Sequence, residues 1–210
     1  MNFYVLRGGY CDDDKEFELY IDEVPDVEDA PQCPTCGGTV GMIPYADPVV
    51  GVLQAGRKCY DLTKQLGGDV MLSERCRETF EREGLSGMNC FQRVKIRRVK
   101  GPMRARGCGE YLLARVSFGA KVDRVRSVLR TSTGVQCPDC GYAGIIEGYD
   151  RVAVDVDSWS GQDFFKLHGL PGPIMVSERA KQVCDRYGLS ICKLIPAEEY
   201  GNSYYPKFGS

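Results

Sequence analysis

The chain has 210 residues, of which 43% are hydrophobic and 27% are charged, and its formal net charge at pH 7 is −2. This composition is typical of a globular protein with a buried core, and its slight acidity is unlike the basic excess of most nucleic-acid-binding domains. No apolar run approaches the roughly 18 residues of a transmembrane helix, and the first residues lack the pattern of a secretory signal. We therefore expect a single cytoplasmic domain over residues 1–210, without membrane association.

Residues 1–32 are expected to form an acidic N-terminal strand segment. Residues 1–10 read as an edge strand, and ten acids accompany a single base between residues 12 and 29. Alternation of apolar and polar residues over 17–22 predicts a strand with one acidic face. Such a face suits a basic partner, although a solvated strand has the same pattern. The candidate partner-binding residues are Asp12, Asp13, Asp14, Glu16 and Glu18.

A first repeat is expected over residues 33–90, and it opens with Cys33-Pro34-Thr35-Cys36-Gly37. Short strands are predicted at 39–43, 48–53 and 70–72 from β-branched residues bounded by Gly and Pro. A helix should begin after Ser73, whose hydroxyl can cap it, and should end near Glu83 because Gly84 favours a left-handed cap. Another strand is expected from Leu85.

Residues 91–136 are predicted to form a basic strand and a loop that connect the two repeats. The seven bases between 93 and 106 have no acid among them. Alternation over 93–97 predicts a strand with one charged face. A loop is expected over 101–109, followed by strands at 111–118 and 121–129.

A second repeat is expected over residues 137–196, and it opens with Cys137-Pro138-Asp139-Cys140-Gly141. Strands are predicted at 144–147, 152–156 and 174–176, and 163–167 leads to a turn at 171–173. A helix should run from its cap Ser177 to Gly188. A strand over 189–195 closes the repeat, and residues 197–210 form a tail.

The two repeats share an ungapped offset of 104 residues. Met71-Leu72-Ser73-Glu74-Arg75 falls on Met175-Val176-Ser177-Glu178-Arg179, and Gly84-Leu85-Ser86 falls on Gly188-Leu189-Ser190. Unrelated segments do not share so many identities in one frame. We therefore predict an α+β fold built from tandem duplicated β-β-β-α-β units. The repeated Ser-Glu-Arg is explained here by helix initiation.

The two Cys-Pro-x-Cys-Gly knuckles indicate a metal site. Two residues between the cysteines let both sulfurs reach one ion, and a zinc ion takes four such ligands. The simplest way to supply four ligands is one zinc-ribbon-like site that joins the repeats. One structural Zn2+ per chain would then be held by Cys33, Cys36, Cys137 and Cys140. The alternatives are that this protein has lost the metal, that the cysteines hold an iron–sulfur centre, or that a CxxC motif is a redox-active cysteine pair. His168 is expected to be a surface or hydrogen-bonded residue, because four thiolates already fill the site.

The other seven cysteines are expected to be reduced and to behave as small buried hydrophobes. They are Cys11, Cys59, Cys76, Cys90, Cys108, Cys184 and Cys192. We also expect no enzyme activity. The sequence has no histidine-containing nucleophile constellation and no glycine loop for a phosphate, and a four-cysteine site has no open position for a substrate.

The chain resembles the double-CXXCG motif proteins of myxobacteria, a family of immunity proteins. The resemblance rests on the two knuckles, on Asp163-Phe164-Phe165-Lys166-Leu167, on Ile174-Met175-Val176-Ser177-Glu178-Arg179 and on the closing Lys193-Leu194-Ile195-Pro196. It is firmest over 137–196 and weakest over 1–32 and 91–130.

This resemblance implies a cytoplasmic antidote that binds a cognate toxin and blocks it. The acidic residues 12–29 would suit a basic toxin, whereas the bases of 93–106 would suit an acidic one. The alternative function is a zinc-ribbon module that binds nucleic acid through those bases. A redox or metal-carrier protein is a third possibility.

Overall fold

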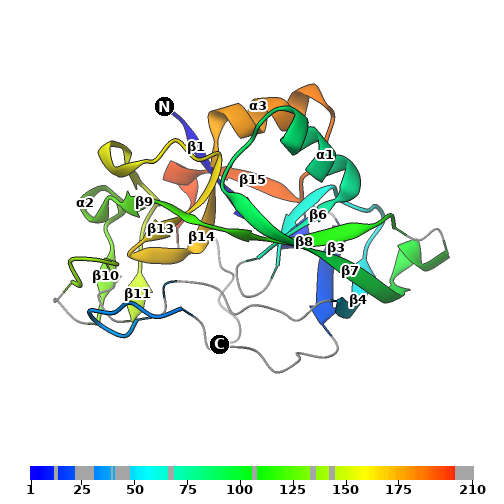
Figure 1. Cartoon of the computed structure of the whole chain (residues 1–210), viewed down its shortest axis with the longest axis horizontal. Coiled ribbons are helices and arrows are strands. Elements are labelled where there is room, and N and C mark those ends of the chain that lie inside the picture. The colour runs from blue at the N-terminus through cyan, green and yellow to red at the C-terminus, as the bar shows by residue number, and fades with distance from the viewer. Residues whose placement is uncertain are drawn as a thin grey trace.

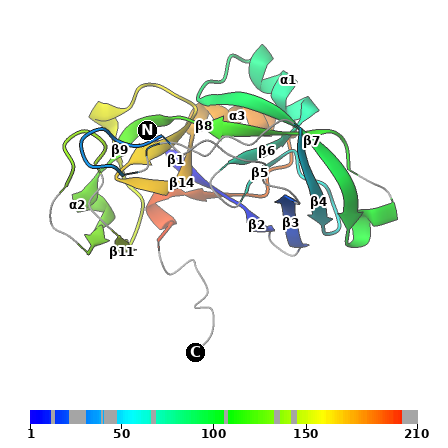
Figure 2. The same ribbon diagram turned by 60° about the horizontal axis from the view of Figure 1, so that its bottom comes forward.

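The structure is a computed structural model that describes residues 1–11, 14–21, 31–38, 40, 48–65, 69–105, 108–132, 136–141 and 145–201, with the side chains of 9–11, 14–16 and 104–105 left out. The fold is α+β and consists mostly of sheet (Figure 1). Two large sheets lie next to each other, and two helices pack side by side on them (Figures 1 and 2). None of the helices in the described ranges has the length and apolar character needed to cross a membrane.

A six-stranded sheet combines the second predicted repeat with strands from outside it. Its strands, in spatial order, are β12 (Val154–Asp155), β9 (Phe118–Val122), β13 (Phe164–His168), β14 (Leu170–Ser177), β1 (Phe3–Arg7) and β15 (Lys193–Pro196). The β9–β13 pair is parallel and the other pairs are antiparallel.

A seven-stranded sheet is built around the first predicted repeat. In spatial order it contains β2 (Gly9–Cys11), β3 (Asp14–Ile21), β4 (Val49–Ala55), β7 (Met88–Lys100), β8 (Tyr111–Val116), β6 (Val70–Ser73) and β5 (Leu62–Lys64). The β4–β7 pair is parallel. A separate two-stranded ladder joins β10 (Arg130–Thr131) and β11 (Ile146–Gly148).

Helices α1 (Glu74–Arg82) and α3 (Glu178–Arg186) begin and end in the same way. The hydroxyls of Ser73 and Ser177 accept hydrogen bonds from the amides three residues later, at 3.2 and 3.1 Å. Gly84 and Gly188 follow the helices with φ angles of 61° and 57°, the left-handed conformation that glycine tolerates best. The caps at both ends of both helices were therefore predicted correctly.

Strand β1 lies inside a sheet, so the prediction of an edge strand over residues 1–10 was wrong. It pairs with both β14 and β15, although these belong to the far end of the chain. Strand β8 has the corresponding position in the other sheet, between β6 and β7. The sequence pattern could not reveal this, because alternation identifies a strand but not its neighbours.

The largest core cluster draws on both sheets and both helices. It includes Leu72 and Phe80 from the first predicted repeat and Val176 and Cys184 from the second. Two further clusters fill the outer parts of the two sheets. Helices α1 and α3 contribute the buried residues Cys76, Thr79, Phe80, Ala180, Val183 and Cys184.

Several predicted strand boundaries differ from the structure. The strand expected over 121–129 ends at Val122, and the chain then forms the short helix α2 (Arg124–Ser127), capped by Asp123. The strands expected from Leu85 and from 189 begin at Met88 and Lys193. The 152–156 segment keeps only β12 before the 3-10 helix η3 (Val156–Ser158), and the 39–43 strand lies almost wholly outside the described residues. Two more 3-10 helices are η2 (Pro102–Ala105) and η4 (Ala197–Glu199).

The seven cysteines outside the knuckles do not all follow the prediction of reduced, buried thiols. Cys76 and Cys184 are free and buried, as expected. Cys59 and Cys108 form a disulfide, Cys192 is also disulfide-bonded, and Cys90 is free but exposed. The side chain of Cys11 is outside the described part. Pairing of cysteines 49 residues apart depends on tertiary contacts that the spacing alone does not show.

Candidate metal centre

Each knuckle is a tight turn closed by its own backbone. The amide of Gly37 donates to the carbonyl of Cys33 at 2.8 Å, and the amide of Gly141 donates to that of Cys137 at 3.0 Å. Both glycines have left-handed φ angles, 68° and 71°, which a residue with a Cβ adopts only with strain. The amide of Gly38 also points at the sulfur of Cys36, at 3.4 Å.

The two knuckles face each other, residue against equivalent residue. The sulfurs of Cys33 and Cys137 are 3.8 Å apart, and those of Cys36 and Cys140 are 3.5 Å apart. All four sulfurs lie within 4.8 Å of one another. Thiolates that surround one ion at about 2.3 Å in a tetrahedron stand about 3.8 Å from each other. The four sulfurs are thus close enough together to hold one metal ion.

The surroundings favour the ionised form of Cys33 but not of Cys36, whose pKa is raised because the lowering effect of the Gly38 amide is outweighed by burial and by the thiols of Cys137 and Cys33. Cys33, Cys137 and Cys140 are 3%, 7% and 8% exposed, whereas Cys36 lies at the surface. The pKa of Cys33 is lowered to about 7, first by the backbone amide of Cys36 and then by that of Thr35. The hydroxyl of Thr35 donates to Asp139 across the junction. Thiolates are the form of cysteine that binds metals.

The structure thus brings together all four predicted metal-ligating cysteines. His168 is not part of the group: its ring stacks on Phe118 at 4.6 Å, and its buried Nδ1 has no hydrogen-bond partner in the described structure. The side chain as a whole is partly exposed, in agreement with the expected surface residue.

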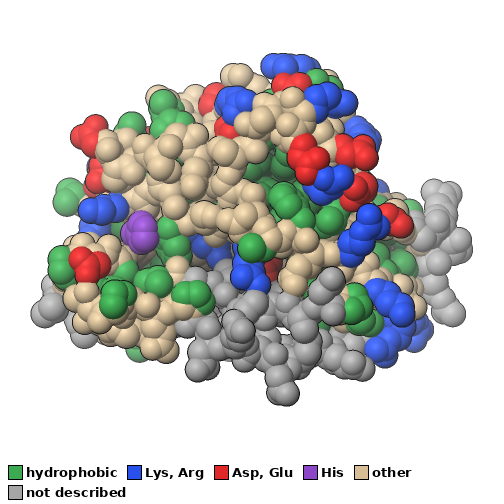
Figure 3. Space-filling view, in the orientation of Figure 1, with side chains coloured by type: hydrophobic (Ala, Val, Ile, Leu, Met, Phe, Trp, Pro, Cys, Tyr) green, Lys and Arg blue, Asp and Glu red, His purple; other side chains and the backbone are tan. Residues whose placement is uncertain are grey.

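The predicted acidic surface lies mostly outside the described residues. Asp12 and Asp13 fall outside them, and only the backbone of Asp14 and Glu16 is described, in β3. Glu18 is partly exposed. The predicted basic face is described better: in β7, Arg93, Lys95, Arg97, Arg98 and Lys100 are all exposed, and Val94, Ile96 and Val99 pack on the core. Lys and Arg side chains gather at this end of the molecule (Figure 3).

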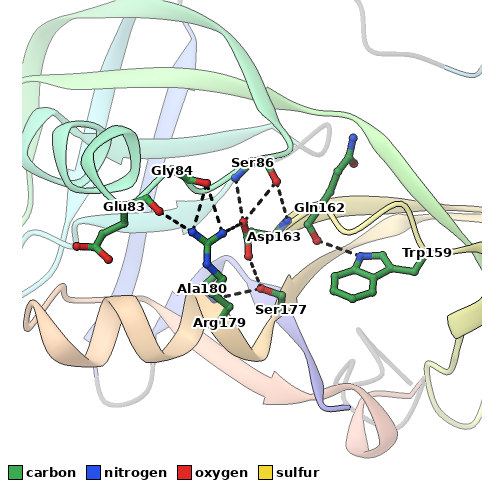
Figure 4. A network of polar contacts seen from close by, with 9 residues as sticks. All are labelled: Glu83, Gly84, Ser86, Trp159, Gln162, Asp163, Ser177, Arg179 and Ala180. Atoms are coloured by element: carbon green, nitrogen blue, oxygen red, sulfur yellow. Dashed lines mark hydrogen bonds and ion pairs between the residues drawn. The ribbon is translucent and has the colours of Figure 1, made fainter.

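A reciprocal polar network that was not predicted from the sequence joins the two helices α1 and α3. Arg179 donates to the carbonyl of Gly84 at the end of α1, at 3.3 Å (Figure 4). Arg75 donates to the carbonyls of Tyr187 and Gly188 at the end of α3, at 2.8 and 3.1 Å. Each arginine thus binds the C-terminal carbonyls of the opposite helix, where a positive charge is favourable. The repeated Ser-Glu-Arg was the available signal, but it was attributed to helix initiation alone.

Two aspartates extend this network to the N-terminal caps of the two helices. Asp163 is 2% exposed and accepts from Ser177 Oγ at 2.8 Å, from the Ser86 amide at 3.0 Å and from Arg179 Nη1 at 2.7 Å (Figure 4). Asp61 accepts from Ser73 Oγ at 2.7 Å and from the amide and hydroxyl of Ser190, both at 2.9 Å. Each aspartate therefore links the cap of one helix to the serine that follows the other.

A pair of lysines was also missed, because single lysines in strands look like solvated residues. Lys64 lies two residues beyond Leu62 in β5, and Lys166 two residues beyond Phe164 in β13. Side chains alternate between the two faces of a strand, so Lys64 lies on the same face as Leu62, and Lys166 on the same face as Phe164. Leu62 and Phe164 both belong to the largest core cluster. Lys166 is only 3% exposed. Its pKa is lowered to about 8, first by burial and also by the charge of Lys64, whereas Asp69 acts in the opposite direction.

Raising the pH from 8 towards 10 should stabilise the wild-type chain relative to Lys166→Met. The pKa of Lys166 is about 8 when folded and near its ordinary 10.5 when unfolded. Between these values the unfolded chain holds a proton that the folded chain has released, so stability rises with pH. The full pKa difference corresponds to about 3 kcal/mol, of which about 2 kcal/mol is gained between pH 8 and 10. Denaturant unfolding of both proteins at several pH values measures it, and parallel pH profiles would contradict the prediction.

Comparison of the sequence with models of known protein families and with curated proteins gives no match.

Proposed function

We propose that this protein is a non-catalytic immunity protein that binds a cognate toxin and neutralises it. The observation that carries the proposal is the junction of two Cys-Pro-x-Cys-Gly knuckles in one group of four sulfurs. The same knuckles carry the resemblance to the double-CXXCG immunity proteins. A site closed by four thiolates has no position for water or substrate, which fits a structural role.

The metal that we propose is one structural Zn2+ per chain. Four cysteine sulfurs in a compact group are the ligand set of structural zinc sites, and iron–sulfur centres use the same residues. Zinc is favoured by the small size of the group, with neighbouring sulfurs 3.8 and 3.5 Å apart, which suits a single ion. Its binding would join the knuckles and thereby the two repeats.

The repeats themselves we attribute to a tandem duplication. Equivalent residues 104 positions apart meet at the knuckles, as in the pairs Cys33–Cys137 and Cys36–Cys140. The contacts that Arg75 and Arg179 make with the opposite helices also correspond at this offset. Reciprocal contacts of this kind are expected of two copies that pack about an approximate two-fold axis.

The proposed location is the cytoplasm, where a toxin delivered by another cell would act. The Cys59–Cys108 disulfide counts against this location, because disulfides persist mainly in oxidising compartments. Alkylation of free thiols in intact cells, followed by mass spectrometry, measures whether Cys59 and Cys108 are reduced in place. A fully oxidised pair would contradict a cytoplasmic protein.

For the toxin-binding surface we retain the acidic residues Asp12, Asp13, Asp14, Glu16 and Glu18. Replacing Asp12, Asp13 and Asp14 together by Asn should slow association with a basic toxin about tenfold at low salt and weaken its salt dependence, because charge steers encounter. The matched control replaces Arg93, Lys95 and Arg97 by Gln on the exposed face of β7. Unchanged association of the acidic variant, with slower association of the control, would assign the contact to β7.

The experiment that identifies the partner captures the tagged, full-length protein from its own cells. We expect one dominant co-purified protein, about one zinc per chain, and growth arrest when that protein is expressed alone. Co-expression with this chain should restore growth. A co-purified protein that is harmless on its own would contradict the immunity function.

A zinc-ribbon module that binds nucleic acid is the second candidate, and the exposed basic face of β7 favours it. Its affinity should fall steeply with salt concentration, since phosphate contacts release counterions. Nucleic acid in the captured sample, lost in the Arg93, Lys95 and Arg97 variant, would support this candidate over the first.

A further inference from the structure

The buried lysine pair, Lys64 and Lys166, is not explained by the proposed metal centre or by toxin binding. Lys166 is 3% exposed, and the structure shows no hydrogen bond or ion pair for its ammonium group among the described residues. The ammonium of Lys64 donates to the carbonyl of Gly172 at 2.8 Å, and this side chain is partly exposed. Lysines this deeply buried are rare in proteins unless they are paired.

The described charged groups around Lys166 do not balance. Among the described residues, those that act on its ammonium are Lys64, which is positive, and Asp69, which is negative and 2% exposed. Two ammonium groups with one carboxylate leave one positive charge in excess. A buried, uncompensated charge costs several kcal/mol, so buried charges are usually matched by an opposite charge.

The two lysines come from equivalent places in the two sheets. Lys64 is opposite Val70 in the β5–β6 pair, and Lys166 is opposite Ile174 in the β13–β14 pair. Val70 and Ile174 differ by the repeat offset of 104 residues and are both fully buried. Val70 and Ile174 also belong to the same core cluster, and the ammonium of Lys64 reaches across to Gly172 in β14, the strand that pairs with Lys166.

We propose that Lys64 and Lys166 form a binding site for a small oxyanion with a phosphate or carboxylate group. Ammonium groups only donate hydrogen bonds, so the pair matches a ligand that only accepts them. Charge-assisted hydrogen bonds to an oxyanion would satisfy Lys166 and cancel the excess charge. The partial exposure of Lys64 leaves a side of the pair open to solvent.

The test adds inorganic phosphate to the full-length, zinc-loaded protein at pH 7, with chloride at equal ionic strength as the reference. Phosphate should raise the melting temperature by several degrees more than chloride, and calorimetric titration should show one site per chain. Sulfate and acetate are separate arms: a stronger response to acetate than to phosphate assigns the site to carboxylates, a response to phosphate and sulfate without acetate assigns it to tetrahedral oxyanions, and a response to phosphate alone assigns it to phosphoryl groups.

Two variants and a control locate the binding. Lys166→Met should weaken phosphate binding at least tenfold and should melt higher than the wild type in phosphate-free buffer, since a buried charge is removed. Lys64→Met should weaken phosphate binding as well. Lys95→Met removes the same charge from the exposed face of β7 and should change the affinity less than twofold. No response to any of the oxyanions beyond that to chloride, or equal phosphate affinity in Lys166→Met and wild type, would overturn the proposal.

Discussion

Replacement of Cys137 by Ser should abolish binding of the proposed zinc and lower the stability of the protein more than any other single change considered. Cys137 is 7% exposed, and its sulfur lies 3.8 Å from that of Cys33. A serine hydroxyl is a poor substitute for a thiolate at zinc, and the remaining thiolates would repel each other without the ion. Structural zinc contributes about 10 kcal/mol or more of apparent binding free energy, so we expect a loss above about 5 kcal/mol or a failure to fold.

The exposed ligand Cys36 provides a milder variant if Cys137→Ser does not fold. Cys36→Ser should carry less than a tenth of the wild-type zinc by elemental analysis, and a chelator should lower the melting temperature of the wild type but not of the variant. Cys90→Ser is the matched control, because Cys90 is also free and exposed but lies outside the cluster. A full complement of zinc in Cys36→Ser would refute the shared four-cysteine site. Iron in place of zinc would support the iron–sulfur alternative.

Asp163→Asn should destabilise the fold by about 3 kcal/mol, the second-largest effect that we expect. The carboxylate is 2% exposed. It accepts hydrogen bonds at 2.7 to 3.0 Å from Arg179, from the helix cap Ser177 and from the amide of Ser86, which follows α1. Breaking a buried charged network by removing one partner costs about 3–5 kcal/mol. We place the effect at the lower end because Arg179 is 55% exposed and regains water. Denaturant unfolding at equal zinc content measures it.

Asp185→Asn is the control for this prediction. Asp185 also pairs with a base of α3, Lys181, but its side chain is 63% exposed. Exposed pairs contribute little, so the control should lose less than about 0.5 kcal/mol. Arg179→Met should cost about 1 kcal/mol on its own, and less in the Asp163→Asn background, because the two residues interact. Equal stability of Asp163→Asn and Asp185→Asn would show that the network does not hold the two repeats together.

The features predicted best from the sequence are those set by neighbouring residues. Ser73 and Gly84 mark the ends of α1 because a hydroxyl cap and a left-handed glycine each act within one turn. The charged face of β7 follows from alternation in the same way. The grouping of the four cysteines was also predicted, since one CxxC knuckle supplies only half the ligands that a zinc ion needs.

Contacts between distant parts of the chain were predicted less well. Arg179 was treated as part of a helix start, yet its guanidinium lies at the end of α1, 95 residues away from its own position. Lys166 was predicted only as part of a segment that leads to a turn, yet it lies in β13 and is buried. Neither residue differs in its local sequence from a solvated arginine or lysine, so only the packing of the two sheets distinguishes them.

The sequence by itself determined the two knuckles, the caps of both helices and the places of most strands, because these depend on residues a few positions apart. Only the tertiary structure decided that β1 completes the sheet of the distant second repeat and that β8 completes that of the first. It also decided which cysteines form disulfides and that Lys166 is buried. Strand pairing and burial are determined by the fit of whole surfaces, and a pattern of alternating residues does not specify which surface will lie opposite.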